Sequence, residues 1–149
     1  MNTSPTLPAE DLSASVLVSK RNAALKNFTE LSGRTLLALL FLLSGLGKLG
    51  AYNATAAYMA SVGVPGALLP AVIAIEVLGA LAIIFGWKTH VVATLLAGFS
   101  VLTALTFHNN FADQIQMIMF WKNISIAGAF LLLVVHGAGP VSIDARSAK

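Results

Sequence analysis

Four long apolar stretches dominate the pattern of hydrophobic and polar positions along the chain. They lie at residues 35–47, 68–87, 91–107 and 117–136. The second contains one charged residue, Glu76, the fourth contains one, Lys122, and the other two contain none. A helix needs about 20 residues, with a range of about 17–25, to cross the hydrocarbon of a bilayer. The first stretch reaches residue 51 if the Lys48 side chain extends to the interface. The pattern therefore predicts four transmembrane helices.

Short connections separate these stretches. Residues 87–90 form a tight turn between the second and third, and residues 108–116 join the third to the fourth. The connection at residues 52–67 is longer and contains Gly63-Val64-Pro65-Gly66, a turn signal just before the second stretch. Because short links force consecutive helices to run antiparallel, we expect an all-α membrane protein with an up-down-up-down four-helix bundle at residues 34–144.

The segments outside the bundle are expected to be tails, at residues 1–33 and 145–149. Residues 1–11 contain two prolines and are expected to lack regular structure. Further along, apolar residues recur at helical spacing with basic residues between them. The apolar residues are Leu17, Ala24, Phe28 and Leu31, and the basic ones are Lys20, Arg21 and Lys26. This pattern is typical of an amphipathic helix that lies on a membrane surface, although a frayed basic tail would also explain it.

The basic residues near the ends of the predicted spans indicate an orientation. Those on one side are Lys20, Arg21, Lys26, Arg34, Lys88, Arg146 and Lys149. Only Lys48 and Lys122 lie toward the other side. Because cytoplasmic loops carry the excess of lysine and arginine, both termini are expected in the cytoplasm.

Composition excludes several classes of protein. Hydrophobic residues make up 57% of the 149 residues and charged residues 10%, whereas a soluble domain is about 25% charged. The chain has no cysteine, which excludes disulfides, thiolate catalysis and iron–sulfur clusters. A formal charge of +3 is too small and too dispersed to indicate nucleic-acid binding. A single carboxylate in the bundle is too few for a carboxylate-bridged metal centre, so no metal site is expected.

The polar residues of the spans gather in one half of the predicted bundle. With helices alternating in direction, the residues that fall in the outer half are Lys48, Glu76, His108, Lys122 and Asn123. Glu76 is the deepest, about 12 Å along its helix at about 1.5 Å per residue. Its partner is predicted to be Lys122 or Lys48, because a charge inside a membrane normally faces the bundle and is paired. The cluster is either a structural ion pair or a proton or ligand site. Arg34 lies at the opposite, inner end.

A set of short motifs, in this order and at this spacing, resembles the DoxX family of small bacterial membrane proteins. The motifs are Arg34, Gly47-Lys48, Tyr58-Met59, Gly63-Val64-Pro65-Gly66, Leu69-Pro70, Glu76, Gly79, Phe85-Gly86, Ala97-Gly98-Phe99, Phe107-His108, Asn110-Phe111-Ala112, Met119-Phe120, Lys122-Asn123, Gly128, Phe130-Leu131-Leu132-Leu133, Gly139 and Ser142-Ile143-Asp144. The resemblance covers residues 34–144. It implies a four-helix protein of the bacterial inner membrane, and some members resemble subunits of quinone-linked oxidoreductases.

The resemblance implies an auxiliary component of a membrane redox system. Because the chain has no cysteine and no dinucleotide-binding glycine motif, we expect no intrinsic cofactor and no stand-alone enzyme activity. Bound quinone, a membrane oxidoreductase partner and a homo-oligomer are the expected associations besides the lipid bilayer. Two alternatives are a small-solute transporter or permeation protein, and a membrane scaffold with no chemistry of its own.

Overall fold

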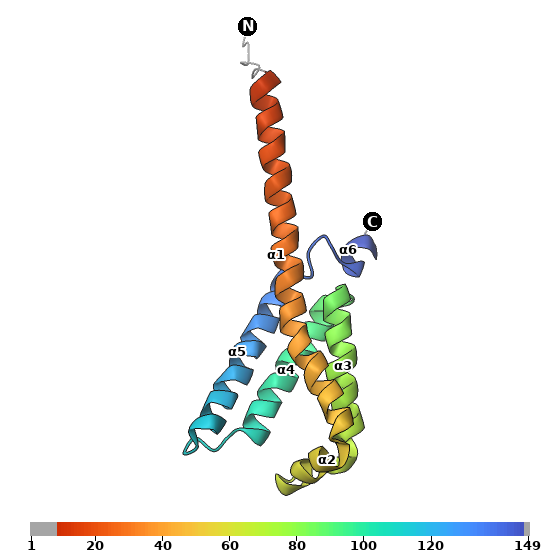
Figure 1. Ribbon diagram of the computed structural model, residues 1–149, viewed down its shortest axis with the longest axis vertical. Coiled ribbons are helices and arrows are strands. Elements are labelled where there is room, and N and C mark those ends of the chain that lie inside the picture. The colour runs from red at the N-terminus through yellow and green to blue at the C-terminus, as the bar shows by residue number, and fades with distance from the viewer. Residues whose placement is uncertain (1–8, 148–149) are drawn as a thin grey trace.

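The computed structural model describes residues 9–147, and side chains from residue 15 onward, as an all-helical protein (Figure 1). The elements are α1 (Ala9–Gly50), α2 (Tyr52–Ser61), the 3-10 helix η1 (Gly66–Leu68), α3 (Leu69–Phe85), α4 (Thr89–Phe107), α5 (Gln114–His136) and α6 (Ile143–Ser147). No strand occurs in this described part of the chain. Four segments are long and apolar enough to cross a membrane: Ser15–Gly50, Gly66–Phe85, Thr89–Phe107 and Gln114–His136. The predicted all-α fold with four membrane-spanning helices is confirmed.

The four long helices run up and down and pack as two pairs. Helix α1 packs most extensively on α3, and α4 on α5. The two pairs lie together where α6 lies and diverge toward the end where α2 lies (Figure 1). These two ends of the bundle are called the α6 end and the α2 end below. Helix α1 enters and α5 leaves the bundle at the α6 end; the cytoplasmic location of this end stays a prediction.

Helix α1 differs from the expected tail and span. It is one continuous helix of 42 residues, about 63 Å long at about 1.5 Å per residue, with no boundary at residue 34. Its first half extends beyond the α6 end of the bundle (Figure 1). Residues 9–11 were expected to be irregular and are helical, while residues 1–8 lie outside the described residues. The placement of residues 15–31 on a membrane surface stays a prediction.

The two remaining differences concern short helices. The connection at residues 52–67 contains α2, which was not expected, because a helix of 10 residues is too short to read as a span. The segment 145–149 was expected to be a tail, but Ile143–Ser147 forms α6, and residues 148–149 lie outside the described part.

The larger of two buried apolar clusters occupies the middle of the bundle and its α6 half, and a smaller one, with Met59, Leu69 and Ile73, lies at the α2 end. The larger cluster contains Ala38 and Phe41 of α1, Ala80 and Ile83 of α3, Ala93, Leu96 and Ala97 of α4, and Ala127 and Phe130 of α5. The Phe41 and Phe130 rings meet edge to face with 5.3 Å between their centroids. Most of the other core positions carry alanine, which lets helices approach closely in a membrane, where packing rather than water exclusion holds them together.

Candidate functional site

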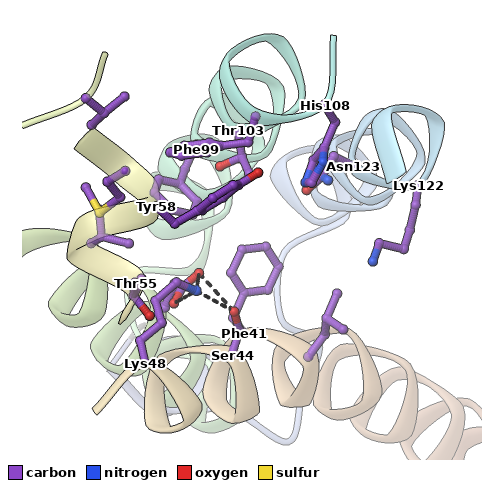
Figure 2. Close-up of a pocket in the computed structure, with 16 residues that line it drawn as sticks. Phe41, Ser44, Lys48, Thr55, Tyr58, Phe99, Thr103, His108, Lys122 and Asn123 are labelled. Carbon is purple, nitrogen blue, oxygen red and sulfur yellow. Dashed lines mark hydrogen bonds and ion pairs between the residues drawn. The ribbon is translucent and has the colours of Figure 1, made fainter. Parts of the chain in front are cut away.

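A cavity of about 310 Å³ lies between the two helix pairs toward the α2 end (Figure 2). Every long helix contributes to its wall, and α2 covers it. The lining residues are Leu40, Phe41, Ser44, Lys48, Thr55, Tyr58, Met59, Val64, Val72, Glu76, Phe99, Thr103, Phe107, His108, Lys122 and Asn123. The five residues that the sequence singled out at this depth all belong to this set. The structure therefore brings the predicted cluster together around one cavity, while its chemical role stays a prediction.

One wall of the cavity carries an ion pair between α1 and α3. Lys48 Nζ donates to both carboxylate oxygens of Glu76 at 2.8 Å and to Ser44 Oγ at 2.7 Å. Ser44 Oγ in turn donates to Glu76 Oε1 at 3.2 Å. Glu76 is buried, with 5% of its surface exposed. Of the two cations that the sequence left open as its partner, the structure selects Lys48.

This ion pair depends on how α1 and α3 pack. Ser44 and Lys48 are four residues apart and therefore lie on one face of α1. Gly45 lies against α3, because a Cβ built on it would come within 2.7 Å of Val77 Cγ2 and 3.1 Å of Glu76 Cβ. A larger residue at position 45 would push α3 away from Lys48. The glycine thus sets the approach that lets the lysine reach the buried carboxylate.

The opposite wall comes from the end of α4 and from α5. His108 Nδ1 lies 2.8 Å from Gln116 Oε1, and because an amide oxygen accepts, the ring nitrogen is the donor. Asn123 Nδ2 donates to the Met119 carbonyl at 2.9 Å. Lys122 Nζ contacts Met119 Sδ at 2.9 Å, a weak acceptor. Figure 2 shows these α5 side chains across the cavity from Lys48.

Aromatic rings line the space between the two polar walls. The Phe41 and Phe99 centroids are 6.4 Å apart, and those of Tyr58 and Phe107 are 5.8 Å apart. Phe99, Thr103 and Phe107 share one face of α4 at spacings of four residues. A cavity of this size, apolar with a few polar groups, is typical of small-molecule sites. Ser44 and Thr103 were not singled out from the sequence, and Tyr58 appeared there only within a family motif. Ser44 could have been found from its spacing to Lys48.

Arg34 does not belong to this cavity. It lies near the α6 end, with 3% of its surface exposed, and its guanidinium donates from Nη1 to the Ala138 carbonyl and from Nη2 to the Val141 carbonyl. These bonds fix the segment between α5 and α6 against α1. The structure thus gives Arg34 a role in anchoring the C-terminal segment, whose carbonyls lie 104 and 107 residues further along the chain.

Asp144 of α6 caps helix α4, a contact the sequence did not reveal. Its carboxylate accepts from the backbone N–H groups of Lys88 at 2.7 Å and Thr89 at 2.8 Å. Lys88 precedes the helix with a positive φ of 46° and offers no side-chain cap of its own. Desolvation raises the pKa of the Asp144 carboxyl, but the hydrogen bonds from Thr89 and Lys88 and the nearby His90 together hold it below its ordinary value. Asp144 therefore supplies the negative charge that favours a helix N-terminus.

Gly86 makes room for this C-terminal segment. It ends α3 with a φ of +65°, and a Cβ built on it would collide with Ser142 Cβ and Ala138 Cβ. The Asp144 N–H also donates to the Gly86 carbonyl at 2.9 Å.

Among the residues that the structure describes, no group of three or more histidine or acidic side chains is placed to hold a metal ion.

Comparison with known proteins supplies the family. The DoxX family model matches residues 30–109. Inner membrane protein YqjF of Escherichia coli (strain K12) is 48% identical over 114 residues, which cover 76% of this chain and 88% of that protein. Inner membrane protein YphA of the same organism is 40% identical over 123 residues, covering 78% and 88%. No solved structure matches this chain significantly. With its four membrane-capable helices, the chain is an inner membrane protein of the DoxX family.

Proposed function

We propose that the cavity at the α2 end binds a lipophilic ring compound of the quinone class, and that the protein serves as an auxiliary component of a membrane redox system. The single observation that carries this proposal is the convergence of five polar residues from α1, α3, α4 and α5 on one aromatic-lined cavity. A purely structural ion pair needs Lys48 and Glu76 alone. It does not need His108, Lys122 and Asn123 to line the same space.

The chemistry of the lining suits a quinone head. A cavity of about 310 Å³ accommodates one substituted ring. Phe41 and Phe99 offer apolar and aromatic surface to the ring, since aromatic side chains pack edge to face or offset against one another. The hydroxyls of Tyr58 and Thr103 are donors for a carbonyl oxygen, and Nε2 of His108 is an acceptor for a quinol hydroxyl. Both oxidation states of the ligand therefore find partners.

The redox part of the proposal assigns electron transfer to the ligand and to a partner. The chain has no cysteine to cycle between thiol and disulfide. Its contribution would be to hold the quinone in the membrane, to orient its oxygens and to offer a proton acceptor at His108. A membrane oxidoreductase would then reduce or oxidise the bound ring.

A binding titration tests the proposal. The full-length protein in phosphatidylcholine nanodiscs is titrated with a decyl-benzoquinone and a short-chain naphthoquinone, with empty nanodiscs subtracted. We expect saturable binding of one molecule per chain. The variant Thr103→Phe should lose it, because the new ring fills the cavity from α4. Thr94→Phe is the matched control, since Thr94 is exposed on the same helix and does not line this cavity.

Two outcomes would redirect the proposal. Linear partitioning of both quinones, identical in wild type and Thr103→Phe, would remove the quinone assignment. Protein-dependent flux of a small solute into proteoliposomes, blocked by Thr103→Phe, would move the function to transport.

A further inference from the structure

We infer that the α5 wall of the cavity, and Lys122 in particular, binds an anionic head group, so that the cavity prefers acidic lipophilic ligands to neutral ones. This inference rests on the proposed function, because it concerns the head group of the ligand held in the same cavity. It specifies the charge of that head group and the wall of the cavity that binds it, which the proposed function leaves open.

The first argument is the charge balance of the lining. Lys48 and Glu76 form an ion pair at 2.8 Å and neutralise one another. No other carboxylate lines the cavity. Among the described residues, the two ion pairs are Lys26 with Glu30 and Lys48 with Glu76, so Lys122 has no acidic partner within 4.0 Å. The cavity therefore carries one uncompensated positive charge.

The second argument is the use of hydrogen-bond donors. All three N–H groups of Lys48 are engaged, by Ser44 and by the two oxygens of Glu76. The Ser44 hydroxyl is engaged as well, by Glu76. The ion-pair wall has no donor left for a ligand oxygen.

The α5 wall has unused hydrogen-bond donors. The one hydrogen bond of Lys122 is to the thioether of Met119, which leaves its other two N–H groups for a ligand. Asn123 uses one amide hydrogen on the Met119 carbonyl and keeps the second. The two residues are consecutive on α5 and both line the cavity (Figure 2).

The position of Lys122 makes an anionic partner favourable. It lies eight residues into α5, about 12 Å from the start of the helix at about 1.5 Å per residue. A charge within a span is costly unless it is paired or reaches water. A carboxylate, a phosphate or the enolate of a hydroxyquinone supplies the missing negative charge. The Phe41 and Phe99 side of the cavity then receives the apolar part of the ligand.

A pair of probes that differ in charge and by one methyl group tests the inference. The full-length protein in phosphatidylcholine nanodiscs is titrated with 11-(dansylamino)undecanoic acid and with its methyl ester, and dansyl fluorescence reports binding above that of empty nanodiscs. We expect the wild type to bind the acid about tenfold more tightly than the ester, as a charge-assisted hydrogen bond would give.

Three variants assign the preference to a residue. Lys122→Gln should abolish the preference for the acid over the ester. Lys122→Arg should retain most of it. Lys88→Gln is the matched control, because Lys88 lies on the turn between α3 and α4, outside this cavity. Lys122 is exposed, so thermal unfolding should be the same in all of these variants.

Competition distinguishes two sources of the anion. Displacement of the acid by phosphatidylglycerol in the nanodisc indicates a lipid head group, and displacement by inorganic phosphate indicates a free anion. Equal affinity for acid and ester, or a preference that survives Lys122→Gln, would overturn the inference even if the quinones bind. Failure of the quinones together with Lys122-dependent binding of the acid would instead overturn the proposed function and support the inference.

Discussion

From the ion pair between Lys48 and Glu76 we predict the order of stability of three variants in which one or both residues are replaced. The three variants are Lys48→Met, Glu76→Leu and the double substitution. Removing one partner of a buried pair is more damaging than replacing both by apolar residues, because the remaining charge is left without compensation. We therefore expect both single variants to be less stable than the double variant.

The magnitudes follow from the exposure of each partner. Loss of one partner of a fully buried pair costs about 3–5 kcal/mol. Lys48→Met leaves Glu76, whose side chain is 6% exposed, with Ser44 as its remaining partner, and we expect a cost of about 2–4 kcal/mol. Glu76→Leu leaves a lysine that is 24% exposed and still bonded to Ser44, so a cost of about 1–2 kcal/mol is expected. The double variant should lie within about 1 kcal/mol of the wild type.

Reversible unfolding in mixed micelles measures this order. The fraction of dodecyl sulfate in dodecyl maltoside is raised and helix content is followed by circular dichroism. Lys88→Met is the control, because Lys88 makes no ion pair among the described residues; it should unfold within about 0.5 kcal/mol of the wild type. A double variant that loses the sum of the two single losses, or more, would refute the description of these residues as a coupled buried pair.

Three further predictions concern packing and the α6 end. Gly45→Ala should destabilise the protein, because the new Cβ would lie 2.7 Å from Val77 Cγ2. Gly47→Ala should stabilise it by up to about 1 kcal/mol through helix propensity, because nothing lies within 4 Å of the new Cβ. Thermal unfolding measures both changes in stability. Arg34→Lys should increase hydrogen exchange at residues 138–147, because lysine cannot donate to two carbonyls as a fork, and unchanged exchange there would contradict the anchoring role. Asp144→Asn should cost about 0.3–1 kcal/mol at neutral pH, because the negative charge at the N-terminus of α4 is lost. Folding lowers the pKa of Asp144, so the wild type should be more stable than Asp144→Asn at pH values above the ordinary carboxyl range. This difference in stability should disappear as the pH falls through the lowered pKa of the folded state. The unfolding midpoints of the wild type and of Asp144→Asn should therefore converge in acid.

The spans and the depth of the polar cluster could be predicted from sequence because each rests on a local pattern. Runs of about 20 apolar residues indicate spans, and antiparallel neighbours place Lys48, Glu76 and Lys122 at similar depth. The partner of Glu76 could not be chosen this way. That choice depends on the rotation of α1 and α5 about their axes, which is set by contacts such as Gly45 against Val77.

The α6 end shows a different limit of sequence reasoning. Asp144 caps a helix that begins 55 residues earlier in the chain. An N-cap is normally sought in the residue before the helix, and here Lys88 occupies that position. Short helix α2 was missed for another reason. It is uncharged and has few large apolar residues, of which Met59 is buried, so its sequence shows no clear apolar face.

The small molecules that occupy the cavity in the native membrane decide whether this site binds a quinone. The wild type, Thr103→Phe and Thr94→Phe are extracted from native membranes in a mild detergent, and the bound small molecules are identified by mass spectrometry. We predict a lipophilic ring compound of the quinone class, near one per chain, in the wild type and in Thr94→Phe, and its loss from Thr103→Phe. The same phospholipids and no such compound in all three proteins would contradict it.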